Sequence, residues 1–265
     1  MSALERHAVT VHGVPGGRPM VFAHGFGCDQ GMWRHVWPAF RDEFRVVLFD
    51  HVGYGGSDAS AFDRRRYASL DGYVADVLEI GDELDLEDVV FVGHSVSAMI
   101  GVLAAAARPE RFARLVLVAP SPRYLDDEGY VGGFSEEDVA GLLDSLESNY
   151  LGWSRVMAPV IMGNPDRPEL GEELVNSFCR TDPEIAAAFA RATFLADNRS
   201  DLDRVRIPSL VLQCSEDAIA PRPVGEYVAE RLPDSRFVLL AAVGHCPNLS
   251  APEATIAAIR AFVSE

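Results

Sequence analysis

Short apolar runs recur along the chain, and a stretch with helical periodicity follows most of them. Five runs are apolar at every position; they cover residues 20–23, 46–49, 89–92, 115–118 and 210–212. Strands that are apolar on both faces occur in parallel sheets whose two sides are covered by helices. The alternation therefore predicts an α/β fold with a doubly wound, mostly parallel sheet.

The segments between these runs carry apolar side chains at helical spacing. Leu70, Tyr73 and Val77 fall on one helical face, and Val224 with Val228 begins another. Pro252 stands where a last helix would begin, because proline is favoured in the first helical turn. These segments predict the helices that cover the sheet.

The alternation stops after Pro122, and no further strand is predicted before Ser209. Residues 135–138 and 181–184 instead resemble capping boxes, which mark helix starts. We therefore predict a helical insertion over residues 123–197. A single α/β core would consist of residues 1–122 and 198–265.

The charge balance restricts the possible partners. The 265 residues include 40 acidic and 23 basic ones, which gives a net charge of -17. Nucleic acids and anionic membranes both need a basic face, so neither is an expected partner. All basic residues are arginine. Without lysine the chain can form no lysine Schiff base, no P-loop and no Ser–Lys dyad.

The cysteines, at positions 28, 179, 214 and 246, have neither C-x-x-C nor zinc-site spacing. The first residues contain no apolar signal-peptide segment, and the longest apolar run, residues 99–107, is too short to span a bilayer. We expect a cytoplasmic protein with reduced thiols that needs no metal and no organic cofactor.

A glycine-rich turn at residues 25–31 follows the first apolar run and admits two interpretations. With Asp50 at the end of the next strand, it is close to a dinucleotide-binding fingerprint. Its spacing is G-x-G-x-x-x-G, however, and the bulky Phe26 stands where the backbone would approach a pyrophosphate. Alternatively, His24-Gly25 and the amide that follows build an oxyanion hole. In both cases we expect a helix after the turn.

A second motif favours the oxyanion hole. The run 89–92 leads directly into Gly93-His94-Ser95-Val96-Ser97, and a helix of small residues follows. This order is typical of a nucleophile elbow, in which a sharp turn exposes the serine Oγ and the next amide points to the same cleft. Ser97 replaces the usual last glycine and is nearly as small. The alternative is a plain helix N-cap at Ser95.

A nucleophilic serine needs a histidine base and a carboxylate that orients the base, and after such an elbow the carboxylate precedes the histidine. Asp217 follows the strand predicted near residues 209–213, and Glu216 is its nearest competitor. Of the seven histidines, only His245 lies beyond both other members. We therefore predict Ser95, Asp217 and His245 as a catalytic triad.

These motifs resemble those of the α/β-hydrolase superfamily over essentially the whole chain. The chain is most similar to the RsbQ-like group, which includes bacterial stress-response hydrolases and plant strigolactone and karrikin receptors. The stretches that carry the similarity are residues 25–33, 91–101, 121–125, 149–153 and 244–247. The resemblance implies the same triad, the amides of Phe26 and Val96 as oxyanion hole, and a V-shaped cap of about four helices.

The resemblance also implies an apolar substrate pocket under this cap. By position, the pocket residues are Phe26, Tyr124, Phe134, Leu142, Trp153, Met157, Phe194 and Ile219. Most aromatic residues in proteins are simply core residues. Here their concentration in the insertion that must cover Ser95 favours a pocket.

The predicted activity is hydrolysis of a small apolar ester or lactone, such as a butenolide, through an acyl-enzyme. A serine at the elbow argues against dehalogenase and epoxide hydrolase chemistry, which this fold runs through an aspartyl ester. The alternative is a ligand-gated signalling protein, a sigma-factor regulator that hydrolyses slowly and acts with a phosphatase-type partner. The cap segment 124–154 holds eight acidic residues and no basic one. It could dock such a partner, although a solvated helix face is the simpler explanation.

Overall fold

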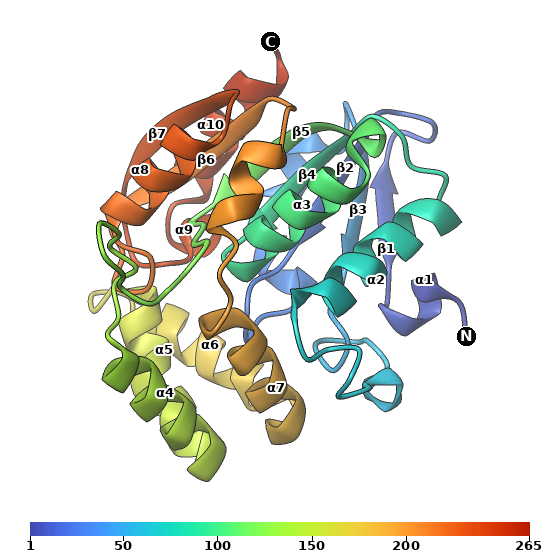
Figure 1. Ribbon diagram of the computed structural model, residues 1–265. Coiled ribbons are helices and arrows are strands. Elements are labelled where there is room, and N and C mark those ends of the chain that lie inside the picture. Colours follow the sequence, from blue (N-terminus) through green and yellow to red (C-terminus); the bar gives the residue numbers. More distant parts are fainter.

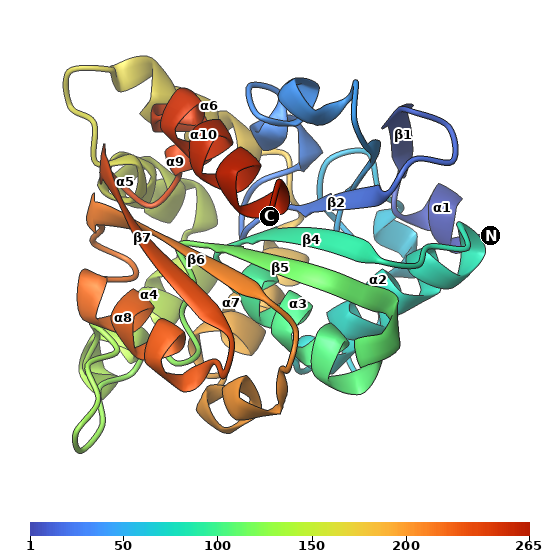
Figure 2. The same cartoon turned by 90° about the horizontal axis from the view of Figure 1, so that it is seen from above.

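A seven-stranded sheet forms the centre of the computed structural model, which describes residues 1–265 (Figures 1 and 2). The strands are β1 (Thr10–Gly13), β2 (Pro19–Ala23), β3 (Arg45–Phe49), β4 (Val89–His94), β5 (Phe112–Val118), β6 (Ser209–Glu216) and β7 (Ser235–Val243). Their order in the sheet is β1-β3-β2-β4-β5-β6-β7. Only the β1–β3 pair is antiparallel. The predicted doubly wound, mostly parallel α/β fold is therefore confirmed.

Alternate side chains of each central strand enter two separate cores. In β2, Met20 and Phe22 pack into one core, while Val21 and Ala23 pack into the other. The helices that cover one face are α2 (Leu70–Glu83), α3 (Val96–Ala107) and α8 (Arg222–Arg231); α9 (Pro247–Ser250) and α10 (Pro252–Val263) lie on the opposite face (Figure 2). The helices predicted around Leu70, Val224 and Pro252 are present as α2, α8 and α10.

Four helices are inserted between β5 and β6. They are α4 (Glu136–Ser148), α5 (Tyr150–Met162), α6 (Pro168–Phe178) and α7 (Pro183–Phe194). Figure 1 shows them grouped together at one end of the sheet. Ser135 and Asp138 form the predicted capping box at the start of α4. The prediction for α7 was wrong by one residue, because Asp182 rather than Thr181 accepts the first amide hydrogen bonds.

Two further elements differ from the sequence prediction. The edge strand β1 was not predicted, because most of its side chains are exposed and its only neighbour in the sheet is β3. The helix expected after the glycine-rich turn is only a 3₁₀ turn, Gln30–Trp33, followed by a second one, Trp37–Phe40. Asp29 caps the first turn through the amide of Gly31.

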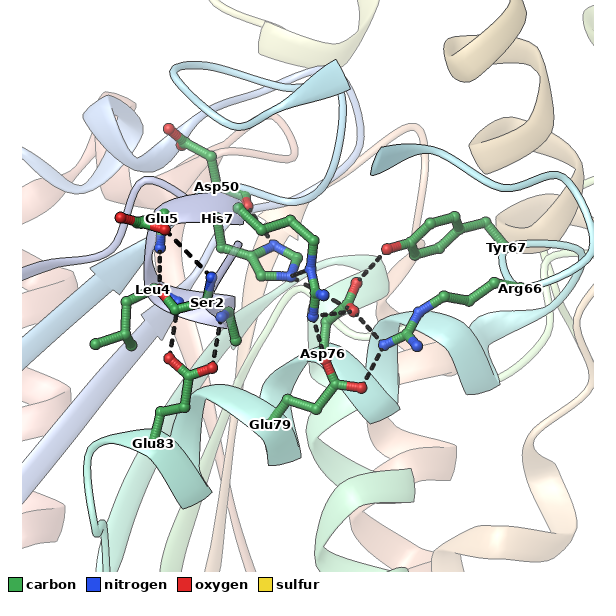
Figure 3. A network of polar contacts seen from close by, with 12 residues as sticks. Ser2, Leu4, Glu5, His7, Asp50, Arg66, Tyr67, Asp76, Glu79 and Glu83 are labelled. Carbon is green, nitrogen blue, oxygen red and sulfur yellow. Dashed lines mark hydrogen bonds and ion pairs between the residues drawn. The ribbon is translucent and has the colours of Figure 1, made fainter. Parts of the chain in front are cut away.

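A buried polar network fastens the N-terminal helix α1 (Ala3–Arg6) to α2 (Figure 3). At its centre is the fully buried Asp76. Asp76 accepts hydrogen bonds from the Tyr67 hydroxyl at 2.8 Å and from Arg66 at 2.6 Å, and the Nε2 atom of His7 lies 3.4 Å away. Burial alone would raise the pKa of Asp76, but the hydrogen bonds from His7, Arg66 and Tyr67 outweigh burial and lower the pKa.

The helices are too short or too polar for any of them to cross a membrane. All four cysteines are free thiols, and only Cys179 is exposed. No three His, Cys, Asp or Glu side chains are grouped so that they could hold a metal ion.

Candidate active site

Ser95 stands on the sharp turn between β4 and α3. Its backbone angles, φ 56° and ψ -122°, lie outside the regions that residues with a side chain normally occupy. The turn is possible because helix and strand approach closely at Gly93, where a Cβ atom would collide with the carbonyl of Ser97. The Ser95 side chain does not cap α3. The structure therefore does not support the plain N-cap interpretation.

Ser95, His245 and Asp217 form a continuous chain of short contacts. The distance from His245 Nε2 to Ser95 Oγ is 2.7 Å, and the distance from His245 Nδ1 to Asp217 Oδ2 is also 2.7 Å. All three residues are buried. A hydroxyl, an imidazole and a carboxylate in this order can move a proton away from the hydroxyl oxygen.

The carboxylate is Asp217 and not its neighbour Glu216. The Oδ1 atom of Asp217 accepts hydrogen bonds from the amides of Ile219 and Ala220 at 2.8 and 3.0 Å, which leaves Oδ2 for the imidazole. Burial raises the pKa of Asp217, but the facing His245 and these amides outweigh burial and lower the pKa. Asp217 is therefore ionised at neutral pH. The Glu216 side chain is exposed.

Two elements hold the loop that carries His245. Its amide donates to the carbonyl of Ile161 at 2.8 Å, at the end of α5. Gly244 precedes it with a positive φ, and a Cβ atom there would collide with the carbonyl of Met162. On the other side, His94 Nε2 lies 2.8 Å from the His245 carbonyl. The insertion and the elbow together thus position the imidazole.

His94 can only donate in this contact, because its partner is a carbonyl oxygen. Burial, reinforced by the nearby His245, lowers the pKa of His94 to about 3. The ring is therefore neutral above that pH, with its proton on Nε2. His94 thus supports the backbone of the loop that carries His245.

The glycine-rich turn lies directly against the elbow. A Cβ atom at Gly25 would collide with the ring of His94 and lie 3.2 Å from Ser95 Cβ. At Gly27 it would overlap the ring of Phe178 from α6, so no pyrophosphate can approach this backbone. The amides of Phe26 and Val96 find no acceptor within the protein. This arrangement favours the oxyanion-hole interpretation over dinucleotide binding.

Ser97 links this turn to the elbow. Its hydroxyl donates to the carbonyl of His24 at 2.5 Å and lies 2.9 Å from His51 Nε2. The His24 ring in turn accepts the amide of His51 at 3.0 Å. The sequence interpretation considered only the small size of Ser97. Its polar role depends on His24 and His51, which are far from it in sequence.

A small apolar cavity lies over Ser95 and His245. Seven predicted pocket residues line it: Phe26, Tyr124, Leu142, Trp153, Met157, Phe194 and Ile219. The eighth, Phe134, is not among the lining residues; its ring packs against those of Tyr124 and Phe194. The sequence interpretation missed other lining residues, namely Cys28, Ile161, Leu174, Thr193 and Cys246. They come from separate segments, and no local pattern marks them.

A family model described as the alpha/beta hydrolase family matches residues 20–258. The chain belongs to this family. This hydrolase is 39% identical to a karrikin insensitive 2 receptor of Petunia hybrida over 253 residues, which cover 95% of this chain and 93% of the relative. It is 41% identical to a strigolactone esterase of Arabidopsis thaliana over 238 residues, 89% of each chain.

A solved structure shows the same architecture. The hydrolase superposes on a hydrolase from Oleispira antarctica with a TM-score of 0.96 and 39% sequence identity, over 99% of this chain and 96% of the other. The predicted membership of the α/β-hydrolase superfamily is therefore confirmed, together with the relationship to strigolactone and karrikin proteins.

Proposed function

We propose that this hydrolase cleaves small apolar esters or lactones through an acyl-enzyme on Ser95. The observation that carries the proposal is the chain of 2.7 Å contacts from Asp217 through His245 to Ser95, which ends at the apolar cavity. The similarity to a strigolactone esterase supports an ester or lactone as the substrate class. A butenolide ring is the lactone that we favour.

The first step is attack of Ser95 Oγ on the substrate carbonyl. His245 Nε2 takes the Oγ proton as the new C–O bond forms, because a hydrogen bond already joins the two atoms. Asp217 holds the imidazole with its proton on Nδ1 and stabilises the imidazolium. His245 then gives the proton to the leaving-group oxygen.

The second part of the proposal concerns the oxyanion and the acyl-enzyme. The free amides of Phe26 and Val96 donate to the carbonyl oxygen as negative charge develops on it. Water then attacks the acyl-enzyme, with His245 as base, and releases the acid. No step of this sequence calls for a metal or an organic cofactor.

We further propose that residues 123–197 act as a cap on the core formed by residues 1–122 and 198–265. Residues of the inserted helices, including Leu142, Trp153 and Phe194, line the cavity above Ser95. A substrate must therefore pass or displace this segment. The cap would select small apolar molecules and exclude bulk water during the reaction.

Replacement of the nucleophile tests the proposal. Ser95→Ala should reduce ester hydrolysis by several orders of magnitude, because the covalent route needs the Oγ atom. A fluorophosphonate should label the wild-type protein on Ser95, as read by peptide mass spectrometry. Full activity of the variant, or a label on another residue, would exclude this site as the catalytic one.

Ligand sensing is the second candidate function, since one of the similar proteins carries the name of a receptor. In that case the same triad would hydrolyse its ligand slowly, and ligand binding would change the cap. Slow turnover of a butenolide, with altered hydrogen exchange in residues 123–197, would support sensing. Fast turnover without such a change would support a plain enzyme. A phosphatase-type partner and a cytoplasmic location stay predictions.

A further inference from the structure

A second hydroxyl group lies beside Ser95. Tyr124 stands where the chain leaves the core for the insertion, and its hydroxyl oxygen is 3.3 Å from Ser95 Oγ. The residue is 2% exposed, and its hydroxyl has no other hydrogen-bond partner. The ring packs on Phe194 with 4.9 Å between centroids. Packing therefore fixes the hydroxyl next to the nucleophile.

The direction of this hydrogen bond follows from the neighbouring contact. Ser95 directs its proton to His245 Nε2, so Tyr124 is the donor and Ser95 Oγ the acceptor. Burial raises the pKa of Tyr124 to about 12, which keeps its proton in place at neutral pH. Thr193, the other hydroxyl of the lining, already donates to the carbonyl of Phe189 at 2.7 Å.

We propose that Tyr124 donates a hydrogen bond to the leaving-group oxygen of the substrate while the acyl C–O bond breaks. In the tetrahedral intermediate, Ser95 Oγ and the leaving oxygen are bonded to the same carbon. A donor that reaches Oγ in the free protein can therefore reach the leaving oxygen after a small rotation. This inference rests on the proposed function.

The step balances without a further reactant. The Oγ–C bond forms, the bond from carbon to the leaving oxygen breaks, and the Ser95 proton reaches that oxygen through His245. Tyr124 keeps its own proton and only stabilises the charge on the oxygen. The hydrogen bond from Tyr124 matters most when the leaving group is an alkyl or lactone-ring oxygen, because such an oxygen is strongly basic as it leaves. An acidic phenol leaves readily without it.

Tyr124→Phe removes the hydroxyl and keeps the ring. We would measure kcat/KM for esters with one acyl group and leaving groups that range from p-nitrophenol to a simple alcohol. The alkyl esters should lose about 10- to 100-fold, the effect of one hydrogen bond to a charged oxygen. The p-nitrophenyl ester should change less than about twofold by the same reasoning. The plot of log kcat/KM against leaving-group pKa should therefore become steeper.

Tyr150→Phe is the matched control, because Tyr150 is also a buried tyrosine of the insertion and has no contact with Ser95. Its leaving-group dependence should equal that of the wild type. Fluorophosphonate titration gives the concentration of active protein, and each kcat/KM is calculated from that concentration. Partial unfolding lowers the concentration by the same factor for every ester, so it cannot change the slope against leaving-group pKa.

An unchanged slope in Tyr124→Phe, or an equal loss for aryl and alkyl esters, would overturn the role of Tyr124. The proposed function is judged separately by Ser95→Ala on the same esters. If that variant is inactive while the Tyr124→Phe slope is unchanged, only the role of Tyr124 fails. If Ser95→Ala is active, the proposed function itself fails.

Discussion

At the residue scale, glycines allow three loops to meet at the candidate site. A Cβ atom at Gly25, Gly93 or Gly244 would collide with His94, with the backbone of Ser97 or with the backbone of Met162, respectively. These close approaches bring the glycine-rich turn, the elbow and the loop that carries His245 together. A β-carbon at any of the three positions would separate the groups that the chemistry needs within hydrogen-bond distance.

The carboxylate gives a direct test at this scale. Asp217→Asn should lower kcat/KM by about 10⁴-fold, because an amide permits the wrong imidazole tautomer. Glu216→Gln is the matched control, since the Glu216 side chain is exposed, and its backbone carbonyl still accepts the amide of Gly244 at 2.7 Å in the variant. The control should stay within about twofold. If Glu216→Gln proved the more damaging change, the assignment of the carboxylate would be wrong.

At the element scale, the two connections between core and insertion are fastened to each other. The amide of Asn198 donates to the carbonyl of Pro122 at 2.8 Å, and Arg123 pairs with Asp197 at 2.9 Å. These bonds lie at the base of the insertion, and α7 also packs on the core, where the ring of Phe189 stacks on that of Tyr73 with 4.2 Å between centroids. The base and α7 are thus anchored to the core, so a movement of the insertion would have to occur in its other helices.

If the insertion acts as the proposed cap, its lining residues should set substrate specificity. Trp153→Ala should widen the cavity and shift the preference toward longer acyl chains by about 10-fold or more, because apolar contacts there set transition-state binding. Phe134→Ala is the comparison, since Phe134 packs against Phe194 and Tyr124 but does not line the cavity. Its chain-length profile should shift less. Unchanged profiles in both variants would place the acyl-binding site elsewhere.

At the scale of the whole molecule, stability depends on the two cores and on the buried network around Asp76. Because the hydrogen bonds from His7, Arg66 and Tyr67 outweigh burial and lower the pKa of Asp76, its ionised form stabilises the fold. This contribution is complete above the unfolded-state pKa of about 3.9. It is lost as the pH falls through the lower pKa of the folded protein.

Asp76→Asn should therefore lower the free energy of unfolding at pH 7 by about 2–4 kcal/mol, since it leaves Arg66 and His7 without their buried partner. The loss of stability on acidification should also become shallower. Urea unfolding at pH 7 and at about pH 2.5, below the unfolded-state pKa, measures both effects. The exposed Asp71→Asn, in the same helix, should change stability by less than about 0.5 kcal/mol. Equal pH slopes in Asp76→Asn and wild type would contradict this account.

The sequence alone was enough to predict the parallel strands at the centre of the sheet, the inserted helices and the order of the triad candidates. Runs such as 89–92 carry apolar side chains on both faces of the strand because both faces are buried. The local composition of the sequence therefore reveals that the strand is buried. The elbow is equally local, since Gly93, Ser95 and Ser97 stand within five residues.

Other features were decided only by the tertiary structure. β1 is held by pairing with β3 and not by burial, so its side chains give no apolar signal. Phe134 and Tyr124 are both aromatic residues of the insertion, yet only Tyr124 reaches Ser95. Sequence patterns report which residues are buried, because hydrophobic burial acts on each residue separately. Which buried atoms meet depends on the packing of distant segments, and no local pattern encodes that geometry.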